Sequence, residues 1–322
     1  MKVDKFIIAI ILVVIAAYFF PHPATSQSPL SLDTISSIGI SLIFFFYGVK
    51  LDIDKLKSSL KNWRLHLLIQ LTTFVIFPLI VLPFYLMTGD EHSRLVWLSF
   101  FFLAVMPSTV SSSVVMVAMA KGNIPAAIFN ASISGMIGII AAPLWLSMFV
   151  STSSDDTSGI ADIYLSLSVE IILPLVLGLF MHRYWGSFAQ RHGKWLTLFD
   201  KAVILLIIYK SFARSFLENI FSDVSWVDLS LISVGVTALF FTVYYLSGHV
   251  SGLLGFERED RITAQFCGTK KSLVHGTVFL KVIFGTSPAA GFVIIPLMVF
   301  HALQIFIISF IAGNQAKNEN AE

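Results

Sequence analysis

Long apolar blocks of roughly 16 to 25 residues alternate along the chain with short polar segments, and a helix of that length crosses the ~30 Å hydrocarbon core of a bilayer. The blocks predict ten membrane-spanning helices, at about 3–20, 33–50, 64–88, 94–120, 124–150, 160–182, 197–217, 229–253, 261–284 and 288–312. No linker separates a soluble domain, and residues 313–322 have the composition of a disordered cytoplasmic tail. The pattern therefore predicts an all-α membrane protein with one transmembrane domain over 1–312.

The composition agrees with this interpretation. Of 322 residues, 56% are hydrophobic and only 12% are charged, whereas ordinary globular domains carry about 25% charged residues. The predicted partner is therefore the lipid bilayer. A net charge of +2 without a basic stripe gives no reason to expect a nucleic-acid partner. The lone cysteine, Cys267, excludes an internal disulfide framework or a thiolate zinc site.

The basic residues predict the orientation of the chain. If the N-terminus is cytoplasmic, most of the 21 lysines and arginines fall in cytoplasmic segments, with the largest group between Lys50 and Arg64. We therefore expect a multi-pass protein of the cell (inner) membrane with both termini in the cytoplasm. An alternative is that Lys2, Lys5 and the following apolar run form a signal peptide. Cleavage would leave nine spans and spoil the charge distribution, so we interpret the run as the first helix.

The two halves of the chain carry similar residues at corresponding positions. Pro143 in the fifth span corresponds to Pro296 in the tenth, and Tyr47 in the second to Tyr209 in the seventh. The offset is about 155 residues, and because five spans per half is an odd number, the halves must have opposite topology, which is the pattern of inverted-repeat transporters. The predicted fold is therefore two inverted five-helix repeats.

The fourth and ninth spans correspond in these repeats, and both contain polar residues at mid-length. The fourth carries Pro107, which removes a backbone donor, followed by Ser111, Ser112 and Ser113, which can cap a restarted helix. The ninth carries the run Cys267–Ser272. Its two lysines would each cost roughly 2.5–3.5 kcal/mol at mid-membrane on insertion scales. Paired discontinuous helices are the best sequence indication of a transporter's binding site.

These breaks supply the candidate substrate-binding residues, which are Lys270, Lys271, Ser111, Ser272 and His275. The lysines could attract an anionic substrate, or they could bond the exposed carbonyls at the end of a half-helix. They could also lie in a loop outside the membrane. His275 could equally be an interior histidine with a structural partner. Glu170 is the one mid-membrane carboxylate, and we expect it to be a proton carrier, a partner for a lysine, or a shallow residue bonded to backbone.

Several stretches, taken in order along the chain, resemble a known family. They are Phe45–Leu51, Trp63–His66, Met106-Pro107 with the serines that follow, Ala126–Asn130, Phe266–Leu273, and Pro296-Leu297 with His301 and Gln304. In these stretches the chain resembles the bile acid:sodium symporter superfamily, and within it the SBF-like branch of bacterial and vertebrate proteins.

The resemblance implies a panel of helices, about 3–50 and 160–217, and a core, about 64–150 and 229–312, in which the discontinuous helices 4 and 9 cross. It also implies two Na⁺ ions behind that crossing. The positions that match the family's ion ligands, or lie nearest to them, are Ser112, Ser113, Thr73, Asn130, Ser134 and Thr269. Sodium is the one cofactor that the resemblance implies, and no His/Cys/Glu set has the spacing of a transition-metal site.

The ninth span departs from the family pattern. Where the family has an acidic ligand this chain has Phe266 or Cys267, and where it has a glutamine this chain has Lys270. A lysine ammonium in that place could do the electrostatic work of the ion permanently, and it would repel Na⁺. Coupling to Na⁺, to protons or to no ion is therefore open.

The resulting functional prediction is a secondary transporter that works by alternating access on a small organic anion, amphipathic anions included. The alternative is a non-transporting membrane regulator, of the calcium-homeostasis kind, that kept the fold. A high-affinity intramembrane Ca²⁺ site would need several oxygen ligands, and Glu170 is the only candidate carboxylate. We do not expect an enzyme, because no spacing places a base beside a nucleophile.

Overall fold

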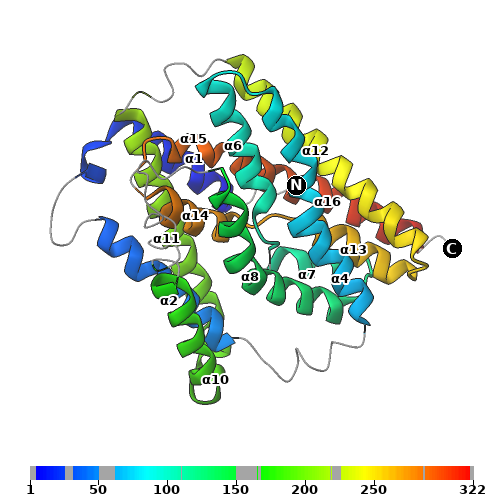
Figure 1. Ribbon diagram of the computed structural model, residues 1–322. Helices are drawn as coiled ribbons and strands as arrows, with labels where there is room; N and C mark the ends of the chain where they lie inside the picture. Colours follow the sequence, from blue (N-terminus) through cyan, green and yellow to red (C-terminus); the bar gives the residue numbers. More distant parts are fainter. Residues whose placement is uncertain are drawn as a thin grey trace. The chain divides into compact units, whose positions relative to one another are not determined.

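The computed structural model describes residues 5–25, 32–50, 62–109, 111–149, 165, 168–217, 219, 226–285 and 287–319 (Figure 1), and throughout these ranges the regular elements are helices. The chain divides into two compact units. Unit 1 comprises Met1–Asp52, Val150–Val224 and Thr277–Ile294, and unit 2 comprises Ile53–Phe149, Ser225–Gly276 and Ile295–Glu322. These units are defined by contacts within the chain. The panel and the core are defined by their roles in transport, and that division stays a prediction.

Six described helices are long and apolar enough to cross a membrane, and they are Leu32–Lys50, Trp63–Met87, Ile124–Ser147, Val169–Arg191, Trp226–Leu253 and Ala290–Ala312. This supports a multi-pass membrane protein. The other predicted spans are shorter, more charged or interrupted. Helix α1 (Lys5–Phe19) has 15 residues, and α11 (Gly193–Leu217) carries Lys194 near its start and Arg214 near its end. The count of ten, the inverted repeats and the crossed helices stay predictions.

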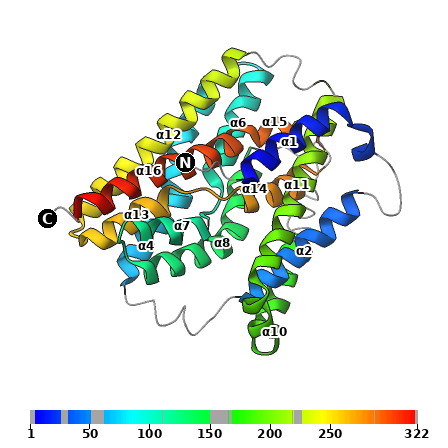
Figure 2. The ribbon, with the colours of Figure 1, turned by 180° about the vertical axis from the view of Figure 1, so that it is seen from behind.

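Unit 1 is built around α2 (Leu32–Lys50) and α10 (Leu173–Arg191), which lie side by side (Figures 1 and 2). Two glycines allow this close contact. A Cβ atom at Gly48 would lie 2.2 Å from the carbonyl oxygen of Leu175, and one at Gly178 would lie 2.0 Å from that of Phe45. Because neither glycine has a side chain, the backbones of the two helices can lie this close together.

Further elements of unit 1 include a turn before α10 and helices that pack on α11. The π-helical turn η5 (Ser168–Ile172) precedes α10. Helix α1 packs along α11, and the Tyr209 hydroxyl donates to the Phe20 carbonyl oxygen at 2.5 Å. Helix α15 (Ala290–Val293) also packs on α11.

Unit 2 begins with an almost continuous helical segment of four pieces. These are α4 (Trp63–Leu71), the π-helix η3 (Thr72–Ile76), α5 (Phe77–Val81) and the 3₁₀ helix η4 (Leu82–Met87). Its other helices are α6 (Glu91–Val105), α7 (Ser111–Met119), α8 (Ile124–Ser147), α12 (Trp226–Leu253), α13 (Arg258–Thr269) and α16 (Ile295–Glu319). Helix α14 (Leu273–Phe284) starts in unit 2 and ends in unit 1. Helix α12 packs along α13 and α16 (Figures 1 and 2).

Local capping explains where two helices of unit 2 begin. Asp90 precedes α6 and forms a reciprocal capping box with Ser93, so the free N–H groups of the first turn are satisfied. Hydrogen bonds from Ser93 lower the pKa of the exposed Asp90 carboxyl. Asn123 caps α8 by accepting the Ala126 N–H at 3.0 Å.

One predicted boundary is corrected by the structure, and one helix extends into the predicted tail. The sixth span was expected to end at 182, but α10 continues to Arg191. Charged and aromatic residues there face outward without breaking the helix, and no proline interrupts it. The sequence predicts a disordered cytoplasmic tail over 313–322, and α16 extends into this segment as far as Glu319. Residues 320–322, and most of 160–167, lie outside the described residues.

We predict that Gly178→Ala destabilises the protein by about 1–3 kcal/mol, because the new methyl group forces α2 and α10 apart. Thermal unfolding in detergent would measure the change. Gly193→Ala is the matched control in the same unit, since a Cβ atom there has nothing within 4 Å. Equal melting temperatures for Gly178→Ala and the wild type would show that the two helices are not in close contact.

Candidate functional site

Two helix breaks meet in unit 2. Helix α6 ends at Val105 and α7 begins at Ser111, while α13 ends at Thr269 and α14 begins at Leu273. The breaks are therefore present where polar residues interrupt the apolar runs. They bond to each other through the main chain, because the Ser272 N–H donates to the Pro107 carbonyl oxygen at 2.8 Å.

A side chain adds a second link between the breaks. The Ser108 hydroxyl donates to the Cys267 carbonyl oxygen at 2.8 Å, and the Ser108 N–H donates to the Ser134 hydroxyl at 3.0 Å. Groups in one break thus form hydrogen bonds with backbone groups of the other break that have no partner within their own helix. Backbone at membrane depth requires such partners.

Lys271 is fully buried at this junction. Its ammonium donates to three main-chain carbonyl oxygens, those of Thr73 at 2.8 Å, Ala104 at 2.6 Å and Met106 at 2.8 Å. The ammonium also lies 4.1 Å from the centre of the Phe77 ring, within the range of a cation–π contact. An ammonium has three N–H donors, so in this conformation none remains for a substrate.

Prolines explain why these carbonyl oxygens are available. In the π-helix η3 each carbonyl bonds to the N–H five residues on, and for Thr73 that residue is Pro78, which has no N–H. At the end of α6, the N–H that Ala104 would bond in a continuing helix belongs to Ser108, and it bonds Ser134 instead. The helix stops there because Pro107 follows. Lys271 therefore binds carbonyl groups that two prolines have released.

Lys270 is also fully buried, and its ammonium donates to the Ser112 carbonyl oxygen in the first turn of α7 at 2.7 Å. The main chain of Lys271 is held by Gln304 of α16. The Gln304 Oε1 accepts the Lys271 N–H at 2.9 Å, and the Gln304 Nε2 donates to the Lys271 carbonyl oxygen at 2.8 Å. One amide side chain thus replaces the helical hydrogen bonds that the break removes. Gln304 of α16 therefore links this helix to the break between α13 and α14.

Two helices begin at the breaks and point their N-termini at this junction. Ser272 caps α14, because its hydroxyl lies 2.9 Å from the His275 Nδ1 and accepts the His275 N–H at 3.3 Å. At the start of α7, the Thr109 hydroxyl bonds those of Ser112 at 2.7 Å and Ser113 at 3.0 Å. The N-terminus of a helix carries a partial positive charge, so the junction favours a negative ligand. The side chain of Ser111 lies outside the described residues.

The other predicted ion ligands already have protein partners. The Thr73 and Thr269 hydroxyls donate to carbonyl oxygens one turn earlier in their own helices, at 2.9 and 2.5 Å. The Asn130 Nδ2 lies 2.7 Å from the His66 Nδ1, and the Gln70 Nε2 donates to the Asn130 Oδ1 at 3.0 Å. The Gln70 Oε1 is buried and has no hydrogen-bond partner among the described atoms.

Glu170 lies in unit 1, in the π-helical turn η5, so it is not part of the junction. Its carboxylate pairs with the Lys281 ammonium at 2.9 Å and accepts a hydrogen bond from the Ser37 hydroxyl at 3.1 Å. Of the three interpretations of Glu170, the structure shows a partner for a lysine. Its use as a proton carrier stays a prediction.

Six long apolar helices, together with two interrupted helical segments whose polar backbone is satisfied inside the protein, define a multi-pass membrane protein. The model of the SBF-like CPA transporter family matches residues 4–317. The chain belongs to this family, which confirms the resemblance noted from the sequence and indicates a transporter rather than an enzyme.

Curated relatives agree with this assignment. The chain is 32% identical over 317 residues to protein PA2026 of Pseudomonas aeruginosa, covering 98% of this chain and 94% of that protein. It is 31% identical over 309 residues to "Putative symporter YfeH" of Escherichia coli K12, with 96% and 92% covered. It is 31% identical over 312 residues to sodium/bile acid cotransporter 7-B of Xenopus laevis, with 95% and 90% covered.

We predict that Gln304→Leu destabilises the protein more than Gln304→Glu does. Leucine leaves both the N–H and the carbonyl oxygen of Lys271 unpaired, at a cost of about 1–3 kcal/mol for each buried group. A protonated glutamic acid accepts the N–H with one oxygen and donates its O–H to the carbonyl oxygen. Thermal unfolding of the three proteins in one detergent would measure the difference. Equal melting temperatures for all three would show that Gln304 does not hold the break.

Proposed function

We propose that this protein is a secondary transporter that moves a small organic anion, amphipathic anions included, by alternating access of a core against a panel. The observation that carries the proposal is the junction of two helix breaks around buried Lys270 and Lys271, in a chain that belongs to a transporter family. Irregular backbone at membrane depth is tolerated only where protein buries it or a cavity meets it, and in transporters such breaks form the binding site.

The charges at the junction support an anionic substrate. Two ammonium groups and two helix N-termini converge there, and the described contacts of both ammonium groups are with carbonyl oxygens rather than carboxylates. We propose that Lys270, whose ammonium donates to the Ser112 carbonyl oxygen, contacts the anion together with Ser111, Ser272 and His275. Lys271 contributes positive charge, and its own donors stay on the carbonyl oxygens.

The same junction supports transport without bound sodium. Main-chain carbonyl oxygens and a ring face are groups that also bind metal cations, and here the Lys271 ammonium occupies three such oxygens. A tethered ammonium satisfies these carbonyl oxygens but cannot leave with the substrate, so it cannot couple a sodium gradient to transport. The remaining candidate for an ion ligand is the buried Gln70 Oε1 beside Asn130.

A second candidate function is a non-transporting membrane regulator. The permanent occupation of the junction by Lys271 favours it, because a site filled by the protein itself needs no ion to keep its structure. The name of sodium/bile acid cotransporter 7-B, which is 31% identical, favours transport over this second function.

We predict no sodium-specific stabilisation of the wild type and a sodium-specific rise in the melting temperature of Lys271→Gln. Removing the ammonium frees three carbonyl oxygens for a metal cation, and an ion at 100 times its Kd stabilises by ~2.7 kcal/mol. The measurement is thermal unfolding in NaCl against equimolar choline chloride. Lys270→Gln tests whether the first lysine acts in the same way.

Lys194→Gln is the matched control, because this exposed lysine of α11 lies in unit 1 and outside the junction. A sodium-specific shift in the wild type would show that an ion site survives beside Lys271, and the proposal of sodium-independent transport would be wrong.

We predict saturable uptake of an organic anion into proteoliposomes, unchanged when choline replaces sodium. Lys270→Ala should lower the uptake about tenfold or more, because a charge-assisted hydrogen bond contributes about 1.5–3 kcal/mol. The probes are taurocholate and a panel of smaller carboxylates and sulfonates, with Lys194→Ala as control. Absence of flux for the whole panel, from a protein that unfolds cooperatively, would favour the regulator.

A further inference from the structure

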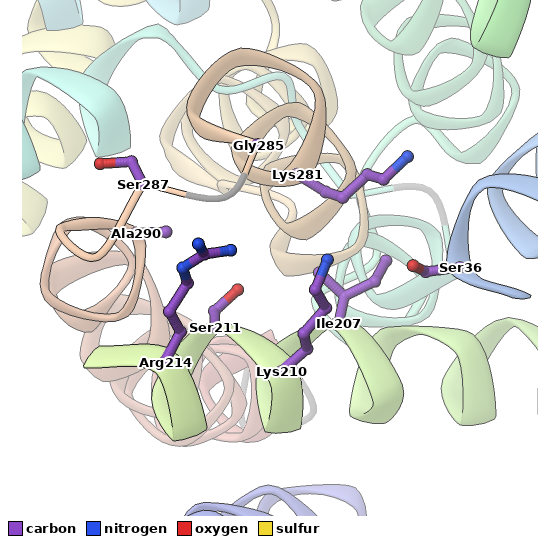
Figure 3. A pocket seen from close by; sticks show the side chains of 9 residues that line it. All are labelled: Ser36, Ile207, Lys210, Ser211, Arg214, Lys281, Gly285, Ser287 and Ala290. Carbon is purple, nitrogen blue, oxygen red and sulfur yellow. The ribbon is translucent and has the colours of Figure 1, made fainter. Parts of the chain in front are cut away.

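A cavity in unit 1 has walls rich in positive charge (Figure 3). It lies among α2, α11, the end of α14 and the segment that leads into α15. The polar side chains that line it are Ser36, Lys210, Ser211, Arg214, Lys281 and Ser287. In Figure 3, Lys210 and Arg214 extend from α11 into the space in front of Gly285. Three cationic side chains thus line one narrow cavity.

Two of the three cations have a carboxylate partner. Lys281 pairs with Glu170 at 2.9 Å, and Lys210 pairs with Asp33. Arg214 has no carboxylate partner within the described part of the chain, and its side chain is only partly exposed. The cavity wall therefore carries one positive charge in excess, held by a guanidinium that has five N–H donors.

Hydrogen bonds and close packing join α11 to α15 beside Arg214. The Ser215 hydroxyl donates to the Pro288 carbonyl oxygen, and it accepts the Gly291 N–H at 3.0 Å. A Cβ atom at Gly291 would lie only 2.4 Å from the Ser215 Oγ, so α15 approaches α11 as closely as glycine permits. Gly285, with φ of +48°, turns the chain between α14 and this segment. The backbone on this side of the cavity is thus fixed by contacts within the protein, which lowers the cost of binding.

We propose that this cavity is a binding site for one small oxyanion, a carboxylate or a phosphate group, held by the Arg214 guanidinium. A planar two-oxygen anion matches the guanidinium fork and accepts two parallel hydrogen bonds. The hydroxyls of Ser211 and Ser287 are further donors on the same walls. The cavity is narrow, so it takes the charged head of a ligand rather than a whole amphipathic molecule.

The site is separate from the junction in unit 2, and its existence does not depend on the proposed transport. A carboxylate or phosphate can come from a free solute or from a lipid headgroup, since both present the same oxygens to arginine. The chemistry of the site is the same for either source, and an experiment in lipid nanodiscs distinguishes them.

The test is protection of Arg214 from phenylglyoxal, a reagent that modifies arginine, followed by mass spectrometry of the peptide that contains it. The full chain is placed in phosphatidylcholine nanodiscs, with choline acetate or choline chloride at equal ionic strength. At ten times the Kd of acetate, modification of Arg214 should slow about tenfold. Exposed Arg183 of α10, in the same unit, is the internal control and should react equally in both salts.

A second set of nanodiscs, containing phosphatidylglycerol and no acetate, tests a lipid source. Protection by acetate assigns the site to a free solute, and protection only by phosphatidylglycerol assigns it to a headgroup, so both support the proposal. No protection of Arg214 by either would overturn it, as would equal slowing at Arg183.

Variants supply a measurement that does not rely on chemical modification. Acetate should raise the melting temperature of the wild type and of Arg183→Gln relative to chloride. The rise should disappear in Arg214→Gln and return in part in Arg214→Lys, which restores the charge but not the fork. An undiminished rise in Arg214→Gln would also overturn the proposal.

Discussion

The Lys271 ammonium, bound to three main-chain carbonyl oxygens where two helix breaks meet, is the interaction on which the rest of unit 2 depends. A buried charge without partners costs many kcal/mol, and carbonyl oxygens left free in the membrane cost several kcal/mol each. The hydrogen bonds between the ammonium and the carbonyl oxygens offset both costs. The lysine thereby ties the π-helix η3 to the end of α6.

In this arrangement the two prolines and the lysine depend on one another. Pro78 and Pro107 release carbonyl oxygens that no N–H of their own helices can reach, and the break in the ninth predicted span brings a cation to them. Gln304 then pairs with both main-chain groups of Lys271. In a carrier that uses a diffusible ion, the corresponding charge arrives and leaves in each cycle. Here the ammonium group is covalently part of the chain, so it does not arrive or leave as a diffusible ion does.

In unit 1 two lysines pair with carboxylates rather than with main-chain carbonyl oxygens. Partly buried Lys281 faces Glu170 and buried Lys210 faces Asp33, so each pair is close to neutral. Such pairs hold helices in register but contribute little net stability, because desolvation offsets most of the attraction. Arg214 is the exception, and its excess charge on the wall of a cavity distinguishes this region from a purely structural network.

The sequence by itself determined the class of protein, the family, the places where two helices break and the residues gathered at one of them. It could do so because apolar blocks, prolines and charges in apolar surroundings have local physical consequences. Only the tertiary structure decided which partner each charge has. Lys270 and Lys271 are adjacent in sequence, yet one bonds a single carbonyl oxygen of α7 and the other bonds three oxygens from two other segments. Glu170 was separated from its lysine by more than a hundred residues. A hydrogen bond depends on distances of a few tenths of an ångström between atoms from different helices, and those distances exist only after the helices have packed.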